Sequence, residues 1–247
     1  MTGAGRLVAT EVHKAFGDLV VLQGLSLEVP AGRTTALLGP SGCGKSTLLR
    51  VLAGFVPVDG GTVTVDGVPV LGPSPSRGMV AQSSSLFPWL TVADNIAFGP
   101  RERQEGSSSA VQDMLDLTGL ADFKDALPRE LSGGMRQRAA FAQVLVNEPP
   151  LLLLDEPFAA LDAQTRLRLQ EWTVRLLRER PTTTVMVTHD VDEALLLGDK
   201  LGMLTARPSR VQREVPLSFG DHRGRQTLLD PAFLALKGEV LHQVLGA

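Results

Sequence analysis

A glycine-rich stretch in the first quarter of the chain constrains the fold more than any other feature. Residues 39–47 read Gly-Pro-Ser-Gly-Cys-Gly-Lys-Ser-Thr, and they lie between an apolar run at Thr34–Leu38 and a helical pattern at Leu48–Ala53 that Gly54 ends. A buried strand, a glycine-rich turn and Gly-Lys-Ser at a helix start are the context of a phosphate-binding loop. Glycines let successive backbone N–H groups point inward at a polyphosphate, and the helix N-terminus adds partial positive charge.

The side chains of this stretch suit the same chemistry. Lys45 would reach β- and γ-phosphates, and the hydroxyl of Ser46 would ligate Mg²⁺. The alternative, a glycine-rich turn beside a surface lysine, does not account for four matching motif positions with the right flanks. We therefore expect a nucleotide site formed by Gly39, Pro40, Ser41, Gly42, Cys43, Gly44, Lys45, Ser46 and Thr47.

Composition excludes several classes of protein. The chain has 247 residues, of which 43% are hydrophobic, so we expect one large domain or a domain with a sizeable insertion. The net charge of −3 gives no basic field for nucleic acid, and the basic runs 175–180 and 207–213 are interpreted as solvated faces. The single cysteine, Cys43, excludes an internal disulfide and fits a reducing compartment. We expect neither a signal peptide nor a membrane-spanning helix, since neither pattern occurs.

Apolar and alternating runs predict strands in both halves of the chain, separated by a helical segment at 83–149. That segment carries exposed-looking aromatics around Pro88, which indicate an interaction surface. Phe16 lies in the first turn, where its ring would either stack on an adenine base or make a small hydrophobic contact. The expected strands are Leu7–Val12, Val20–Val21, Leu25–Val29, Thr34–Leu38, Thr62–Asp66, Gly78–Ala81, Leu151–Leu154, Thr183–Val187, Leu201–Leu204 and Val211–Val215.

Polar residues follow three of these strands at the edge where α/β folds place ligand contacts. Gln82 follows the strand Gly78–Ala81. Asp155 follows Leu151–Leu154, and we interpret it as the carboxylate that would organise Mg²⁺; the alternative is an acid exposed to solvent at the strand end. Glu156 lies one residue further, where it could face the γ-phosphate and polarise a water. His189 lies at the same sheet edge, placed to touch a terminal phosphate.

A second helix start carries bare amides and a hydroxyl. Ser132, Gly133 and Gly134 stand directly before a helix predicted from Met135 to Val146, so they form either a second anion site or an ordinary N-cap. Asp162 is expected to cap a helix that runs to Arg180. The apolar side of that helix at helical spacing consists of Leu169, Trp172, Leu176 and Leu177, all expected in the core.

The ordered set of these motifs resembles the ATPase subunit of ATP-binding cassette (ABC) transporters over essentially the whole chain. The resemblance implies an α/β fold, a single ABC ATPase domain over 1–247. The core of this domain would be a phosphate-loop NTPase fold with a RecA-like sheet and an antiparallel β subdomain (about 6–82 and 150–215). An α-helical signature subdomain (about 83–149) would be inserted into the core, and a tail (216–247) would follow it. The motifs that carry it are the loop at 39–47, Gln82, the signature at 131–135, the acid pair Asp155–Glu156, Asp162 and His189.

The resemblance also implies a dimer in which ATP lies between the phosphate loop of one chain and the signature of the other. The trans contacts would come from Ser132, Gly133 and Gly134. The other implied roles are nucleotide contacts by Phe16 and Asp162, Mg²⁺ binding by Ser46, Gln82 and Asp155, general base catalysis by Glu156, and phosphate contacts by Lys45, Gln82 and His189.

A finer resemblance is to importer ATPases for nitrate, taurine and alkanesulfonates, carried by residues 87–99, 155–166, 187–194 and 230–236. It implies a peripheral subunit at the cytoplasmic face of the plasma membrane that energises import of a small anion or related molecule. Its partners would be a second copy, integral permease subunits and, indirectly, an extracytoplasmic substrate-binding protein, with no nucleic acid.

The chain departs from the family pattern at Ala81, Met135 and Gln143, where an aromatic, a glutamine and an arginine are commoner. The alternatives are a soluble non-transport ABC ATPase, a nucleotide-binding adaptor that never hydrolyses, an exporter cassette, and an importer subunit for an unrelated substrate. Long coiled-coil insertions and tandem cassettes, typical of the soluble class, do not occur in this sequence.

Overall fold

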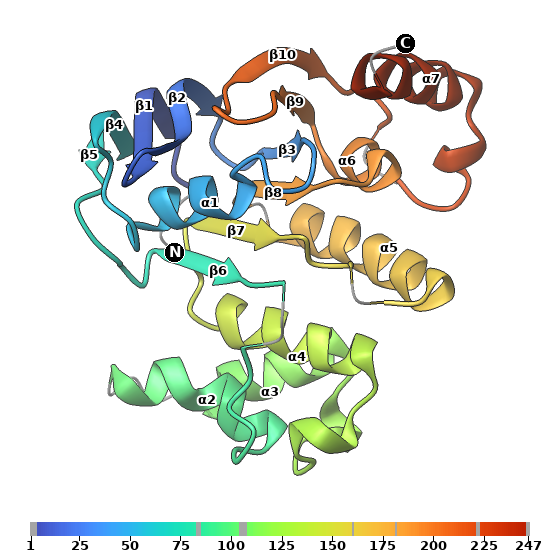
Figure 1. Ribbon diagram of the computed structural model, residues 1–247. Helices are drawn as coiled ribbons and strands as arrows, with labels where there is room; N and C mark the ends of the chain where they lie inside the picture. The colour runs from blue at the N-terminus through green and yellow to red at the C-terminus, as the bar shows by residue number, and fades with distance from the viewer. Residues whose placement is uncertain are drawn as a thin grey trace.

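The computed structural model describes residues 4–82, 85–103, 108–159, 161–180, 182–220 and 223–245. The described residues form two sheets, helices that pack on these sheets, and a separate group of helices to one side (Figure 1). The strands are β1 (Leu7–Phe16), β2 (Leu19–Val29), β3 (Thr34–Leu38), β4 (Gly60–Val65), β5 (Val68–Pro69), β6 (Arg77–Val80), β7 (Leu151–Asp155), β8 (Thr183–Thr188), β9 (Lys200–Leu204) and β10 (Val211–Pro216). The α-helices are α1 (Lys45–Ala53), α2 (Val92–Glu102), α3 (Ser108–Thr118), α4 (Gly133–Leu145), α5 (Ala163–Glu179), α6 (Val191–Leu197) and α7 (Pro231–Leu245). Within the described residues, no helix is long and apolar enough to cross a bilayer.

The central sheet has six strands in the order β10-β9-β3-β8-β7-β6. All neighbouring pairs from β9 to β6 are parallel, and β10 adds an antiparallel edge. The phosphate-loop strand β3 therefore lies between β8 and β9, and the carboxyl ends of β3, β6, β7 and β8 meet at one edge. This is the edge at which parallel α/β sheets bind ligands.

The apolar strand β7 is buried on both faces, which explains its unbroken run of leucines. Leu151 and Leu153 pack with α1 and the antiparallel sheet, whereas Leu152 and Leu154 pack with the helices on the other face. Successive side chains of a strand point to opposite faces, so a strand covered on both sides needs apolar residues at every position.

The four-stranded sheet, in the order β2-β1-β4-β5, is antiparallel and covers α1. The predicted strands Val20–Val21 and Leu25–Val29 are one continuous strand, β2. Gly24, at φ 63°, lies within it, and the pairing of β1 with β2 shifts register nearby. Glycine adopts this left-handed backbone without a Cβ clash, so the residues between the two predicted strands form a bulge within one strand.

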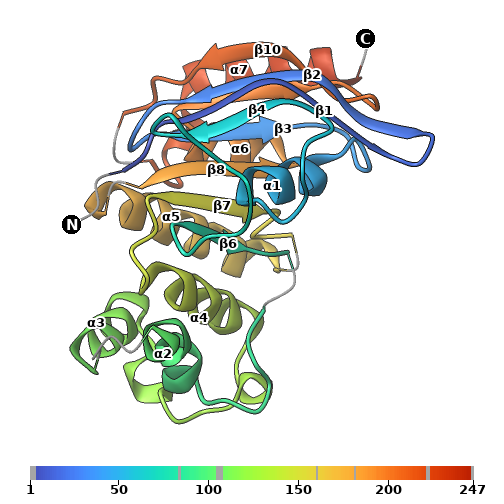
Figure 2. The same ribbon diagram turned by 90° about the vertical axis from the view of Figure 1, so that its left-hand side faces the viewer.

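Helices α2, α3 and α4 form a group beside the sheet edge at β6 (Figure 2). The first residues of the segment expected to be helical, 83–84, lie outside the described part of the chain. Trp172 of α5 packs edge-on against Phe141 of α4, with ring centroids 5.5 Å apart, and its indole N–H donates to the carbonyl of Leu117. Trp172 is therefore half-buried at the junction rather than fully in the core, unlike Leu169 and Leu176.

Candidate functional site

The phosphate loop joins β3 to α1 through a backbone that requires glycine. Gly44 has φ 116°, and a Cβ there would lie 2.6 Å from a methyl group of Val21. A side chain at this position would collide with β2. Lys45 is buried and donates to the carbonyls of Gly39 (2.9 Å) and Pro40 (3.2 Å). The ammonium group is thus held against the loop whose amides begin α1.

Ser46 lies in the first turn of α1, and Asp155 is the last residue of β7. The hydroxyl of Ser46 donates to Oδ1 of Asp155 at 3.0 Å. Asp155 is only 6% exposed, and burial raises the pKa of its carboxyl above the ordinary value, opposed by the hydrogen bond from Ser46. A hydroxyl and a partly desolvated carboxylate in contact are the hard oxygen donors that Mg²⁺ prefers, so these residues fit that ion.

The side chains of His189, Lys45 and Gln82 all contact the carboxylate of Glu156. Its carboxylate lies 3.1 Å from Nδ1 of His189 and 3.4 Å from Nζ of Lys45, and it accepts a 3.4 Å hydrogen bond from the side-chain amide of Gln82. Glu156 has φ 43°, a left-handed backbone that costs a non-glycine residue roughly 1 kcal/mol or more. Its backbone N–H donates to the carbonyl of Val187, which ties the strained turn to β8.

A cavity of about 490 Å³ opens over these groups. Phe16, at the end of β1, is half-exposed at its wall, with the ammonium of Lys14 5.3 Å from its ring centroid. The cavity therefore combines an aromatic platform, a cationic loop and the Glu156 carboxylate. Its lining residues are Phe16, Leu19, Val21, Ser41, Gly42, Gly44, Lys45, Ser46, Thr47, Gln82, Glu156 and Arg207.

The signature residues lie elsewhere. Ser132 is the N-cap of α4, with its hydroxyl accepting from the N–H of Met135 at 3.3 Å. Gly134 is required there, because a Cβ would lie 2.6 Å from a methyl carbon of Thr165. Ser132 and Gly134 line a second cavity of about 480 Å³ that shares no lining residue with the first. A single chain does not bring the two predicted anion sites together.

Asp162 also lies outside the first cavity. It is the N-cap of α5 and accepts from the N–H groups of Gln164 (3.1 Å) and Thr165 (3.0 Å). The hydrogen bonds from Thr165, followed by that from Gln164, hold the pKa of this exposed carboxyl below its usual range. In one chain its contacts are those of a helix cap.

Comparison with known families matches residues 22–159 to the family described as ABC transporter. The chain belongs to the ABC transporter family. It is 42% identical over 235 residues to a taurine import ATP-binding protein of Jannaschia sp. (strain CCS1), covering 92% of this chain and 88% of that protein. It is 44% identical over 229 residues to an aliphatic sulfonates import ATP-binding protein of Burkholderia cenocepacia (strain HI2424), and the match covers 93% of this chain and 83% of that protein.

Solved structures agree with this ABC assignment. The dimeric structure of the bacterial ABC transporter cassette MJ0796 superposes with a TM-score of 0.75 at 28% identity, covering 86% of this chain and 99% of that one. A post-hydrolysis state of the same cassette bound to ADP and Pi gives a TM-score of 0.73. The expected fold, a phosphate-loop ATPase with mixed sheets and helices, is confirmed, and the chain is an ABC ATPase.

Arg207 is a cavity residue of this ABC ATPase that the sequence did not indicate. Arg207 is exposed, as its basic run predicts, and it also lines the phosphate-loop cavity, with its Nη2 3.6 Å from where a Cβ on Gly42 would be. The turn that carries it is fixed: Ser209 donates its N–H to Val21 (2.8 Å) and accepts from the N–H of Gln23 (3.1 Å). That contact between the β9–β10 turn and β2 has no local sequence signal.

Glu193 is a second residue that the sequence did not indicate, although it does not line the cavity. It is 3% exposed in the first turn of α6, and its Oε2 accepts from the hydroxyl of Thr188 at 2.7 Å. The pKa of Glu193 is raised to about 7, mainly by burial. Nearby Asp190 also raises it, whereas the hydrogen bond from Thr188 and the charges of Arg166 and His189 lower it. The first turn of α6 is thus tied to the end of β8, next to the histidine.

Proposed function

We propose that this ABC ATPase hydrolyses ATP to drive import of a small anion of the sulfonate or taurine type. The proposal is supported by the separation of the phosphate-loop cavity from the signature cavity, which share no lining residue. In this proposal one chain holds half of each of two composite sites. Two copies arranged face to face would complete both sites. The names of the relatives support the substrate class, since both describe import of organic sulfonates.

The aromatic, cationic and polar residues at the first cavity have separate roles in this proposal. Adenine stacks on the half-exposed ring of Phe16, and the loop amides with Lys45 hold the β- and γ-phosphates. Arg207, beside Gly42, adds a cation to the same phosphates. Ser46 and Asp155, which are in contact, would hold Mg²⁺ together with Gln82, and the ion would neutralise charge on the phosphate oxygens.

Glu156 is the proposed general base. It accepts a proton from water as the water oxygen bonds to the γ-phosphorus, the bond from that phosphorus to the β–γ bridging oxygen breaks, and ADP and inorganic phosphate leave. His189 and Gln82 both contact the Glu156 carboxylate, so they orient it and reach the same phosphate. Ser132, Gly133 and Gly134 of the second copy supply hydroxyl and amide donors from the other side.

An aromatic patch formed by Phe87, Trp89 and Phe98 is the proposed contact with the permease. Trp89 is 73% exposed, and the Phe87 ring lies 5.7 Å from that of Trp89 and 4.5 Å from that of Phe98. Buried Asn95 fixes this loop through hydrogen bonds with Phe87 and neighbouring carbonyls, and Gln143 of the signature helix donates to Asn95. A rigid exposed aromatic cluster suits a protein interface.

The experiment that tests the proposal is a pull-down of the Glu156→Gln protein with ATP from detergent-solubilised native membranes, read by mass spectrometry. A multi-span permease should be recovered. Trp89→Ala added to the Glu156→Gln protein should lose the permease, and Trp89→Ala alone should keep the ATPase activity of the unchanged protein. Leu71→Ala, at a loop leucine that is 94% exposed, is the matched control and should retain the permease. Recovery of soluble proteins alone would place the chain among soluble ABC ATPases.

A further inference from the structure

The carboxylate of Asp59 holds the stretch of β1 that leads into the aromatic ring of Phe16. Asp59 lies directly before β4, on the segment that leaves α1, and Phe16 is the last residue of β1. Oδ1 of Asp59 lies 2.7 Å from the ammonium of Lys14, and Oδ2 accepts from the backbone N–H of Ala15 at 2.7 Å. The N–H of Asp59 donates to the carbonyl of His13 at 2.9 Å. Asp59 therefore contacts all three residues that precede Phe16.

Lys14 is buried to an extent that is unusual for a lysine. The residue is 8% exposed, and its ammonium lies over the ring of Phe16, 5.3 Å from the ring centroid. A buried ammonium needs an anionic partner, because it has lost much of its hydration. The hydrogen bond from Lys14, followed by that from Ala15, holds the pKa of Asp59 below its usual range. Asp59 is thus ionised at neutral pH and keeps the ammonium in place over the ring.

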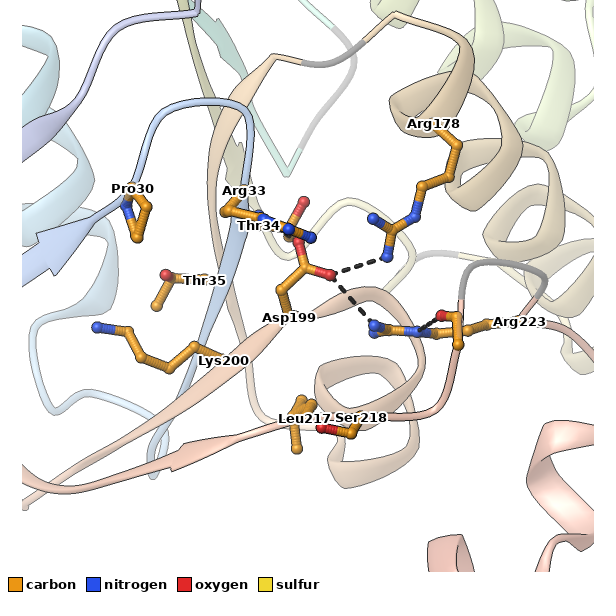
Figure 3. Close-up of a pocket in the computed structure, with 11 residues that line it drawn as sticks. Pro30, Arg33, Thr34, Thr35, Arg178, Asp199, Lys200, Leu217, Ser218 and Arg223 are labelled. Carbon is orange, nitrogen blue, oxygen red and sulfur yellow. Dashed lines mark hydrogen bonds and ion pairs between the residues drawn. The ribbon is translucent and has the colours of Figure 1, made fainter.

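A comparable set of contacts surrounds a second carboxylate, and the comparison shows what is particular to Asp59. Asp199 accepts from Arg178 and Arg223, as the dashed lines in Figure 3 mark, and from the N–H of Thr34. Those partners lie at the opposite end of β3 from the phosphate loop and outside the lining of its cavity. Asp59 instead fixes residues next to a side chain that lines the phosphate-loop cavity.

We propose that Asp59 is a positioning residue for adenine binding, which acts through Lys14 and the backbone that leads into Phe16. The ammonium occupies one face of the ring, and the base of ATP stacks on the other face. Because the ring is already held at the cavity wall, it loses little conformational freedom when the base arrives. This inference rests on the function proposed above, in which Phe16 stacks on adenine.

Binding of a nucleotide and of its phosphates alone separates an effect on the ring from an effect on the phosphate loop. Calorimetric titration of the full chain with AMP-PNP, a non-hydrolysable ATP analogue, and with tripolyphosphate measures the two affinities in the presence of Mg²⁺. Phe16→Ala should weaken AMP-PNP binding about fivefold or more, since it removes the stacking surface. Asp59→Asn keeps the size of the side chain but not its charge, and should weaken AMP-PNP binding about threefold. Both variants should bind tripolyphosphate as tightly as the unchanged protein.

Hydrolysis kinetics give a second readout that a merely structural role would not produce. Asp59→Asn should raise the KM for ATP about threefold and leave kcat unchanged, because contacts with the base are the same in the ground state and the transition state. Lys14→Met removes the ammonium and keeps an apolar stem, so it should reproduce the loss that is specific to the nucleotide.

Asp66 provides a matched control at the other end of β4. It is an exposed acid that follows β4, and its Oδ1 accepts from the backbone N–H of Arg6 at 2.7 Å. Asp66→Asn therefore makes the same chemical change in the same sheet, away from the lining of the phosphate-loop cavity. It should leave the affinities for AMP-PNP and for tripolyphosphate unchanged.

The outcomes separate this inference from the function on which it rests. Normal AMP-PNP binding by Phe16→Ala would remove the stacking role from the proposed function, and this inference with it. If Phe16→Ala weakens AMP-PNP binding while Asp59→Asn and Lys14→Met bind it normally, the stacking role stands and the positioning role is overturned. Equal weakening of AMP-PNP and tripolyphosphate by Asp59→Asn also overturns the proposal. Melting temperatures without ligand show whether each variant is folded, and Lys14→Met decides if Asp59→Asn is not.

Discussion

The carboxylate of Glu156 lies 3.1 Å from Nδ1 of His189, although 33 residues separate them in the chain. Two adjacent parallel strands, β7 and β8, end side by side and bring the pair together. The left-handed backbone of Glu156 turns its side chain back toward the histidine and Lys45. This relationship makes the carboxylate, rather than the phosphate loop alone, the centre of the proposed chemistry.

Glu156→Gln should keep ATP binding and lose turnover. The amide keeps the size of the side chain and its contact with Gln82, but it accepts no proton, so we expect kcat to fall by about 10²–10⁴-fold. Steady-state phosphate release and size-exclusion chromatography with ATP should show an inactive, trapped dimer. Glu179→Gln, at an exposed position at the end of α5, serves as the control. Wild-type turnover in Glu156→Gln would remove Glu156 from the role of base.

Mixing two inactive variants should restore activity if the sites are shared between chains. Lys45→Ala disables the phosphate loop, and Ser132→Arg blocks the signature cavity of the same chain. A mixed dimer then contains one site with both halves intact. Random pairing gives up to about a quarter of the wild-type sites. Phosphate release should appear only after mixing, and a mixture as inactive as its components would argue against the trans arrangement.

Arg207→Gln should weaken ATP binding without unfolding the protein. A charge-assisted hydrogen bond contributes about 1.5–3 kcal/mol, so the dissociation constant should rise about tenfold or more. Equilibrium binding of a fluorescent ATP analogue measures it, and the salt dependence should decrease with the lost charge. Arg210→Gln lies in the same turn outside the cavity and should bind normally. Equal affinities for the two variants would mean that Arg207 lines the cavity without contacting nucleotide.

Glu193 should make stability fall as the pH rises. Its pKa in the folded chain is about 7 against an ordinary 4.5, so the folded state binds more protons between these values. The stability contributed by this group is complete below pH 4.5 and is lost as the pH rises through 7. Glu193→Gln mimics the protonated form, so the two proteins should diverge by roughly 3 kcal/mol at most at about pH 8. Denaturant unfolding across the range from acid to mildly basic pH measures this, and parallel curves would contradict it.

Local motifs predicted most of the fold and the phosphate-loop half of the site, because each depends on contiguous residues. The strand, loop and helix at 34–53 and the leucines of β7 are examples. Three features were not predicted from the sequence, because each depends on contacts between residues far apart in the chain. Arg207 enters the cavity only because Ser209 pairs with β2, and the pKa of Glu193 depends on burial. Likewise, β2 continues through Gly24 because it pairs with β1, which joins the two strands predicted at Val20–Val21 and Leu25–Val29.

The placement of its aromatic residues gives this protein built-in optical probes. The chain contains two tryptophans and no tyrosine. Trp89 stands in water on the aromatic patch, and Trp172 is half-buried along the signature cavity. Indole emission shifts to the blue when the ring leaves water, so each single-tryptophan variant reports on one surface alone. Unlabelled protein could thus be followed in a stopped-flow fluorimeter, with Trp172 timing the approach of a second copy and Trp89 timing arrival at the membrane partner.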